Sequence, residues 1–419
     1  MKYIEATENF IVFCCGKIIL VYQKGSSEGR LIDLPSTGTT PGSEVKALSI
    51  KLSPDEKYLA VACESKVVTV WCTQTWTLQF THNLVKRPVS IDITADSTTL
   101  LVADKTGDVY HFPLKEDTTQ KDVSESADKN GDEDKLTDNK MDSEALLGHL
   151  SMLLDVAVTK NQKYVITCDR DEKIRVSHYP NSYNIESFCL GHTEFVLQIE
   201  ILHGVEPLLL SCSGDGTLKL WNYLSGQCMS SADTHELTTP YIHHFEAFCQ
   251  QKLKDSEEAK RFLPDHPAVK NFSVYTSQDG ECFIAVAVDR IPALFLYKIE
   301  ESKLHYVSAT DMKENIPLIV TWLKSGELIV EQSSVDQPLG VFHLQQNTLT
   351  PLSNHPLMPI GFKYKDDFNR GKKELSIDIL YKQRYDNVAD YLKKKQERLD
   401  TEKAVEAGLV PPVKKGRWL

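Results

Sequence analysis

The sequence predicts an all-β chain that forms a propeller of seven four-stranded blades, and three observations lead to this fold class. Short runs of alternating apolar residues, such as 164–168 and 208–212, indicate strands broken by hairpin turns. A Gly-His pair occurs at 148 and again at 191, 43 residues later. The second unit closes on Trp221, and a repeat of about 40 to 45 residues with these ends is typical of a propeller blade. One blade cannot bury its own faces, so other blades must flank it.

The other blades are expected on both sides of the two Gly-His units. Period and alternation, without the Gly-His pair, place them at 10–22, 47–71, 88–112, 271–299 and 317–344. With the two Gly-His units these make seven blades, which close a ring. We expect an N-terminal strand to complete the last blade, because closure removes exposed sheet edges.

Composition divides the chain into a propeller, two insertions and a tail. A length of 419 residues with 41% hydrophobic composition allows a large core, and we assign 1–360 to the propeller. Residues 115–145 are predicted to be a disordered acidic insertion, because they contain almost no large apolar residues. Residues 236–267 are predicted to be a partly helical insertion. Residues 361–419 form a tail that is basic, although the whole chain carries a net charge of −12.

Several classes of protein are disfavoured by what the sequence lacks. The ten cysteines show no CxxC pairing, which indicates a reducing compartment. Residues 128–132 and the pair His243-His244 lack the ligand spacing of calcium or zinc sites, so we expect no metal. The acidic N-terminus predicts no secretion signal, and the apolar run 10–22 is too short to cross a membrane. No catalytic constellation, phosphate loop or methyl-donor motif occurs, so we expect a platform without enzymatic activity or cofactor.

A set of polar residues in the fifth blade matches the network that ties loops to strands in WD repeats. We expect His192, Ser211, Asp215 and Trp221 to be joined by hydrogen bonds, since buried polar groups need partners. This structural role argues against an acid/base pair. In the fourth blade, His149 and Asp171 occupy the equivalent positions, and Ser177 stands where the tryptophan would be.

Charged hairpin tips are candidates for binding a partner. Superposing the blades on Ala103, Cys168 and Cys212 places Lys105 and the run 170–173 at equivalent tips of neighbouring blades. Both signs of charge at one tip suit an oriented protein partner better than a polyanion. The alternative is a solvated turn in which Asp171 bonds to His149.

The tail contains an amphipathic helix, predicted over 385–403. A positive cluster lies on it, made of Lys393, Lys394, Lys395 and Arg398. The helix is either an exposed amphipathic segment or a contact to nucleic acid or to a partner.

Six segments carry a resemblance to the WD-repeat, non-catalytic subunit of the eukaryotic tRNA guanine-N7 methyltransferase. They are LVADKTGDVYHF, GHLSMLLDVAV, CDRDEKIRVS, IESFCLGHTEFV, GDGTLKLW and YDNVADYLKKKQERL. The match is dense from 100 to 221 and returns in the tail helix. The acidic insertion has no match, and we assign it no role.

The resemblance implies a nuclear scaffold that binds and stabilises a separate catalytic subunit dependent on S-adenosylmethionine. That complex would methylate N7 of a guanine in the tRNA variable loop. The partner-facing residues of the family map onto Lys105, Asp171, Glu172, Lys173 and Arg175. The competing interpretations are a scaffold of another complex, such as a ubiquitin-ligase substrate receptor or an RNA-processing assembly, and a propeller enzyme with a site in its central channel.

Overall fold

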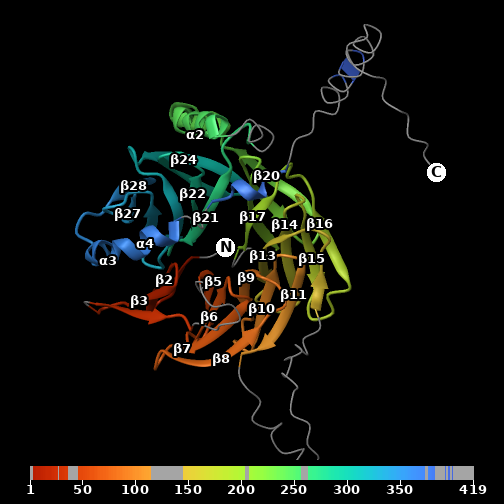
Figure 1. The fold of residues 1–419 in the computed structure, drawn as a ribbon, viewed down its shortest axis with the longest axis vertical. Helices are drawn as coiled ribbons and strands as arrows, with labels where there is room; N and C mark the ends of the chain where they lie inside the picture. The colour runs from red at the N-terminus through yellow and green to blue at the C-terminus, as the bar shows by residue number, and fades with distance from the viewer. Residues whose placement is uncertain are drawn as a thin grey trace, which may run out of the picture.

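The computed structural model contains seven four-stranded antiparallel sheets, arranged as blades around a central axis (Figure 1). The seven-bladed, all-β prediction is therefore confirmed. The structure describes residues 3–26, 28–35, 46–114, 145–202, 207–255, 263–372 and 376–382, together with Leu392, Lys395, Gln396 and Leu399, which are helical. Most of the predicted acidic insertion, 115–144, lies outside these residues.

Each blade consists of four strands that are consecutive in the sequence. Blades 1 to 3 comprise β1–β4 (Ile4–Ala6, Phe10–Cys15, Ile18–Gln23, Gly29–Asp33), β5–β8 (Ala47–Leu52, Tyr58–Cys63, Val67–Cys72, Thr77–Asn83) and β9–β12 (Pro88–Ile93, Thr99–Asp104, Asp108–Pro113, Ala145–Gly148). Blades 4 and 5 comprise β13–β16 (Leu153–Val158, Tyr164–Asp169, Ile174–His178, Ile185–Cys189) and β17–β20 (Val196–Ile201, Leu208–Ser213, Thr217–Asn222, Gln227–Asp233). Blades 6 and 7 comprise β21–β24 (Val269–Thr276, Cys282–Val288, Ala293–Glu300, Lys303–Asp311) and β25–β28 (Pro317–Trp322, Glu327–Gln332, Leu339–Gln345, Thr348–Pro351).

The core lies between the faces of neighbouring blades. The second strand of each blade is packed on both faces, so β18 is buried at every residue, whereas the outer strand β8 is mostly exposed. Polar side chains on the inner strands link neighbouring blades. Asp92 accepts a hydrogen bond from the amide of Val158 (2.9 Å), and Asp155 accepts one from the amide of Ile199 (3.1 Å). The inner strands thus satisfy buried polar groups while joining one blade to the next.

The ring closes by packing between complete blades, so the expected strand exchange at the seam is wrong. β1 is an edge strand of blade 1, and β28 already completes blade 7. Two helices, α3 (Leu357–Lys363) and α4 (Lys365–Gly371), cover the seam beside β27 and β2 (Figure 1). Phe368 of α4 packs edge-on against Phe13 of blade 1, with ring centroids 5.6 Å apart. Apolar helix packing therefore replaces the shared sheet that we expected.

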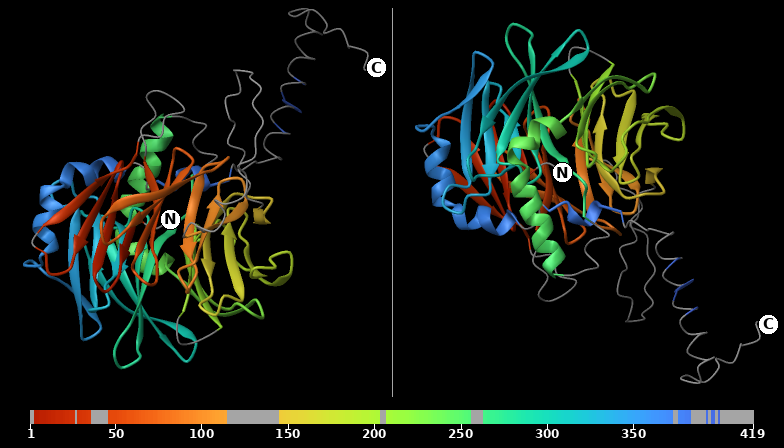
Figure 2. Two further views of the ribbon diagram at one scale, coloured as in Figure 1. Left: turned by 90° about the horizontal axis from the view of Figure 1, so that it is seen from below. Right: turned by 90° about the horizontal axis from the view of Figure 1, so that it is seen from above.

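Helical segments pack on the ring in two places, in the second insertion and after the last blade. The second insertion forms α1 (His235–Thr238), the 3-10 helix η2 (Thr239–Tyr241) and α2 (Ile242–Asp255). Phe245 of α2 is buried in the core cluster shared by blades 5 and 6, and the edge views show α2 against the ring (Figure 2). The 3-10 helix η5 (Asp378–Leu380) also packs on the blades. The packed body therefore extends beyond the expected boundary at 360, and from here on the tail means residues 383–419.

Candidate docking surface on the blade tips

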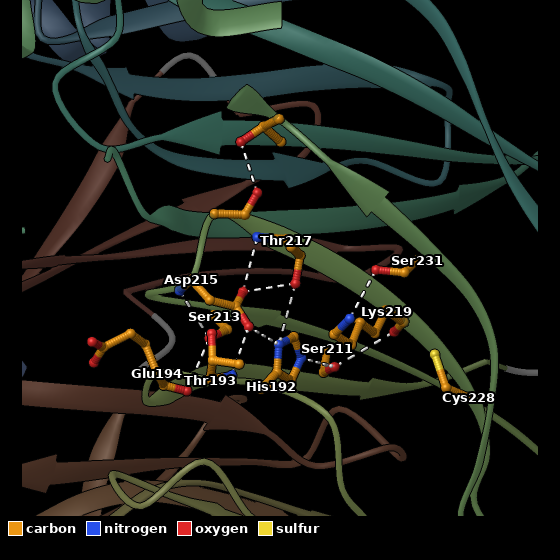
Figure 3. Close-up of polar contacts among 12 residues, drawn as sticks. His192, Thr193, Glu194, Ser211, Ser213, Asp215, Thr217, Lys219, Cys228 and Ser231 are labelled. Atoms are coloured by element: carbon orange, nitrogen blue, oxygen red, sulfur yellow. Dashed lines mark hydrogen bonds and ion pairs between the residues drawn. The ribbon is translucent and has the colours of Figure 1, made fainter. Parts of the chain in front are cut away.

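Blade 5 contains a buried polar network centred on His192. The imidazole lies 2.9 Å from Asp215 Oδ2 through Nδ1 and 2.8 Å from Ser211 Oγ through Nε2 (Figure 3). The indole of Trp221 donates to the same Ser211 hydroxyl at 2.8 Å. The loop before β17, strand β18 and strand β19 are thereby fastened together, and all four side chains are committed to the fold.

Asp215 completes this network from the turn between β18 and β19. It accepts hydrogen bonds from the amides of Thr193 and Thr217, each at 3.0 Å. Burial raises the pKa of Asp215, but the hydrogen bonds from His192 and Thr217 outweigh this and hold it well below its usual range. A buried carboxylate held in this way stabilises the turn and is not available to a partner.

In blade 4 the network uses a different aspartate from the one expected. His149 Nδ1 lies 3.0 Å from Asp169 Oδ2, and His149 Nε2 lies 2.8 Å from Thr167 Oγ1. Asp169 Oδ1 also accepts the amides of Asp171 (2.8 Å) and Lys173 (3.1 Å). The expected pairing of His149 with Asp171 is therefore wrong, because the carboxylate at the end of β14 performs that role.

This change leaves the carboxylates of the blade 4 tip at the surface. The side chains of Asp171 and Glu172 are 43% and 33% exposed, whereas that of Asp215 is 6% exposed. Glu172 has a φ of +66°, at the position where blade 5 has Gly216 with a φ of +74°. Blade 2 has Lys66 with a φ of +63° at the same position, so Glu172 is not the only non-glycine residue at such a described tip. The tip therefore presents two carboxylates on a turn that glycine would form more easily.

The tip of blade 4 also holds the chain that leads into the tail. Arg170 donates to the carbonyl oxygens of Leu380 (2.8 Å) and Tyr381 (3.1 Å). Lys382 Nζ lies 3.1 Å from Asp171 Oδ1 and also contacts Glu172 Oε1. Partial burial raises the pKa of Asp171, but Lys382 outweighs this and lowers it. The sequence placed Arg170 at this tip but could not show its bonds to the tail side of the chain or those of Lys382, because 210 residues separate Arg170 from Leu380.

The tip of blade 3 lies beside that of blade 4, with one loop between them. Lys105 is exposed on the blade 3 tip. The amide of His149 donates to the carbonyl of Gly107 at 2.8 Å, which fixes this loop against the blade 3 tip. Leu150 on the loop is fully exposed. Lys105, Leu150, Asp171, Glu172 and Lys173 thus form one continuous surface, which we call the docking surface.

Arg175 differs from the other predicted partner-facing residues. Its guanidinium donates to Ser177 Oγ (2.9 Å), Gly148 O (3.0 Å) and Ser182 O (3.0 Å). The first of these acceptors stands where blade 5 has its tryptophan. The structure thus gives Arg175 a set of bonds within blade 4 and to its neighbouring loop, while the surface charges are carried by the tip residues.

The remaining candidate residues are only partly described. Lys395 is helical and exposed in the tail, while Lys393, Lys394 and Arg398 lie outside the described residues. None of the ten cysteines, all of which lie in the described residues, forms a disulfide bond. Over the described ranges, no group of three or more His, Cys, Asp or Glu side chains can hold a metal ion. None of the helices described is long and apolar enough to cross a membrane.

The blade geometry and the His192 network define a WD-repeat β-propeller. Known propellers agree in fold alone: a chain of the mitotic checkpoint complex has a TM-score of 0.58 at 12% identity, covering 79% of this chain and 86% of that one. The propeller of Myceliophteria thermophila Cps50 (Swd1) also has a TM-score of 0.58, at 8% identity, covering 82% of this chain and 97% of that one.

Sequence comparison identifies the family. The profile described as the tRNA methyltransferase TRM82 WD40 domain matches residues 36–139 and 118–353. The chain is 32% identical to the tRNA (guanine-N(7)-)-methyltransferase non-catalytic subunit wdr4 of Danio rerio, with 94% of this chain and 91% of the relative covered. The human protein of the same description is 29% identical, with 83% and 75% covered. The chain belongs to this family of WD-repeat, non-catalytic methyltransferase subunits.

Proposed function

We propose that the chain binds and stabilises the catalytic subunit of a tRNA guanine-N7 methyltransferase. We further propose that the complex acts in the nucleus and forms N7-methylguanosine in the variable loop of tRNA. The relatives described above are non-catalytic subunits of this methyltransferase, and their description implies a catalytic partner. Within this proposal the chain itself supplies the platform, and the partner supplies the methyl-donor site.

The observation that carries the proposal is the exposed, charged tip of blade 4. Asp171 and Glu172 lie at the surface because Asp169 makes the structural bonds of this turn. Lys382 pairs with both carboxylates, and the ammonium group of Lys173 donates to the backbone carbonyl of Asp171 at 3.3 Å, so both signs of charge are displayed in a fixed arrangement. Such an arrangement selects an oriented protein partner through complementary charges.

The main test replaces one tip carboxylate and asks whether the catalytic subunit still co-purifies. Glu172→Lys should abolish co-purification and tRNA methylation, since two like charges that face each other across an interface cost several kcal/mol. The matched control is Glu64→Lys, which changes an exposed carboxylate at the equivalent tip of blade 2. Normal yield of the partner with Glu172→Lys, at an unchanged unfolding midpoint, would place the interface elsewhere.

The tail is proposed to contact tRNA within the complex. Lys393, Lys394, Lys395 and Arg398 concentrate positive charge, and phosphate neutralisation by such residues is sensitive to salt and indifferent to sequence. Changing all four to Ala should weaken tRNA binding and flatten the slope of log affinity against log salt concentration. An unaltered slope would make the helix a protein-docking element.

Nuclear localisation is tested separately from binding. A fluorescent fusion of the full chain, expressed at native level, should accumulate in the nucleus. Uniform cytoplasmic signal with normal tRNA methylation would contradict this part of the proposal.

A further inference from the structure

Residues 376–382, which we call the bracket, lie across three neighbouring blades just before the tail. Its apolar side chains Ile377, Leu380 and Tyr381 are 7%, 5% and 4% exposed. Tyr381 packs edge-on against Phe195 of blade 5, with ring centroids 5.0 Å apart. Ile379 between them is 68% exposed. The bracket is therefore seated with one side on the propeller and the other side in solvent.

At Asp378 the bracket is bound to blade 6 and to α2. Asp378 pairs with Arg290 at the turn between β22 and β23, and its second oxygen lies 3.4 Å from Lys252 Nζ of α2. The Arg290 guanidinium lies over the ring of Phe248 at 3.4 Å. One aspartate of the bracket thus joins a blade tip to the inserted helix.

The near end is fastened to the tip of blade 4. Arg170 holds two consecutive carbonyls of the bracket, and Lys382 pairs with Asp171 and Glu172. The ammonium group of Lys382 lies between two carboxylates that would otherwise repel each other. Partial burial lowers the pKa of Lys382, but these two carboxylates outweigh this and raise it, so the ammonium form persists.

We propose that the bracket is part of the docking surface: it fixes the start of the tail beside the blade 4 tip, and Lys382 orients Asp171 and Glu172 for the catalytic subunit. This inference rests on the proposed function. The catalytic subunit would meet the tip and the root of the tail together, on a surface ordered before binding. Preorganisation of this kind strengthens association because less ordering remains to be done in the complex.

The first experiment loosens the bracket without changing any residue of the blade 4 tip. Asp378→Ala combined with Tyr381→Ala, in the full-length chain, removes both ion pairs of Asp378 and the ring contact with Phe195. Hydrogen exchange of the peptide 376–382, measured without partner, should become faster than in the wild-type chain. The dissociation constant for the catalytic subunit should rise about ten-fold or more. Val335→Ala is the control, because this apolar side chain of blade 7, 65% exposed, lies outside the bracket and should change neither value.

The second experiment tests Lys382 as a positioning residue. Lys382→Gln should raise the dissociation constant about five-fold, while the free energy of unfolding falls by under about 1 kcal/mol and exchange at 376–381 stays unchanged. Lys382→Arg keeps the positive charge between the two carboxylates and should restore affinity. A lysine with a purely structural role would leave the affinity unchanged in Lys382→Gln.

The outcomes separate this inference from the proposed function. Rapid exchange of 376–382 in the wild-type chain alone would overturn the bracket, even if the catalytic subunit binds. Normal affinity after the bracket is opened would show that the bracket does not contribute to docking. Failure of the wild-type chain to bind the catalytic subunit would overturn the proposed function and, with it, the docking role of the bracket. Hydrogen exchange of 376–382 would still show whether the bracket is ordered in the chain alone.

Discussion

Blades 4 and 5 build the same repeat but use different aspartates to hold it together. In blade 5 the tip residue Asp215 turns inward and bonds to His192. In blade 4 the equivalent bond to His149 comes from Asp169, two residues earlier relative to the repeat. The position of Asp215 is then taken by Asp171, which lies at the surface with Lys382. Moving the structural carboxylate to the end of the strand thus makes a hairpin tip available for binding.

The largest expected effect is the loss of the inward aspartate of blade 5. Asp215→Ala removes the partner of His192 and of two backbone amides, and should lower the free energy of unfolding by about 3 kcal/mol. Denaturant unfolding measures this value. Below the new midpoint, affinity for the catalytic subunit should be retained. A change under about 1 kcal/mol would show that the network contributes little.

In the same assay, replacement of the two aspartates of blade 4 should lower the free energy of unfolding by different amounts. Asp169→Ala removes the partner of His149 and should cost about 2 kcal/mol of unfolding free energy. Asp171→Ala changes a half-exposed tip residue and should cost about 0.5 kcal/mol. Equal costs at the two positions would contradict the assignment of the structural role to Asp169.

A third prediction concerns the positive φ at the tips of blades 4 and 5, and it replaces glycine by alanine in one tip and glutamate by glycine in the other. Gly216→Ala should destabilise blade 5 by about 1 kcal/mol or more, since φ is +74° and the new Cβ would meet His235 Nε2 at 2.8 Å. Glu172→Gly should leave the unfolding midpoint unchanged or raised, because glycine accepts a φ of +66° without strain.

Binding gives the second measurement for Glu172→Gly. The variant should still weaken co-purification of the catalytic subunit, since it removes a tip carboxylate. A stabilised variant with wild-type binding would show that Glu172 is not part of the interface.

The smallest expected effect concerns pH. The pKa of Asp171 is lowered in the folded chain, so its ion pair with Lys382 stabilises the fold above the unfolded pKa and loses this effect as pH falls through the folded value. The free energy of unfolding of wild type should exceed that of Lys382→Gln by under about 1 kcal/mol at pH 6. This difference should shrink as the pH falls below about 4. Unfolding curves from pH 6 to pH 3 test this, and a constant difference would contradict it.

Local pattern was sufficient to predict the blades and the His192 network. Alternating strands and the spacing from His192 to Trp221 lie within one repeat, so the sequence contains the whole signal. The choice between Asp169 and Asp171 could not be made in this way. The repeat aligns Asp171 with Asp215, and only the structure shows that His149 bonds to Asp169 instead.

Contacts between distant segments were not predictable from periodicity. Arg170 reaches the carbonyl of Leu380, and Lys382 reaches Glu172, only because the chain completes the ring and then crosses blades 6 and 5 to return to blade 4. The seam was also mispredicted, because the alternation of 348–351 does not reveal which blade that strand joins. A signal that could have been used is the apolar spacing of Ile377, Leu380 and Tyr381, which precedes the charged helix and indicates a seated segment.

The manner in which the ring closes has a consequence for how the chain folds during synthesis. Since no blade borrows a strand from the other end, each sheet can be completed once its own four strands have left the ribosome. Only the joint between the first and last blades must wait, and it needs Leu357, Ile360 and Phe368 to cover it. A nascent chain that stops before residue 357 would hold seven finished sheets, with the seam between blades 1 and 7 still without its cover of α3 and α4.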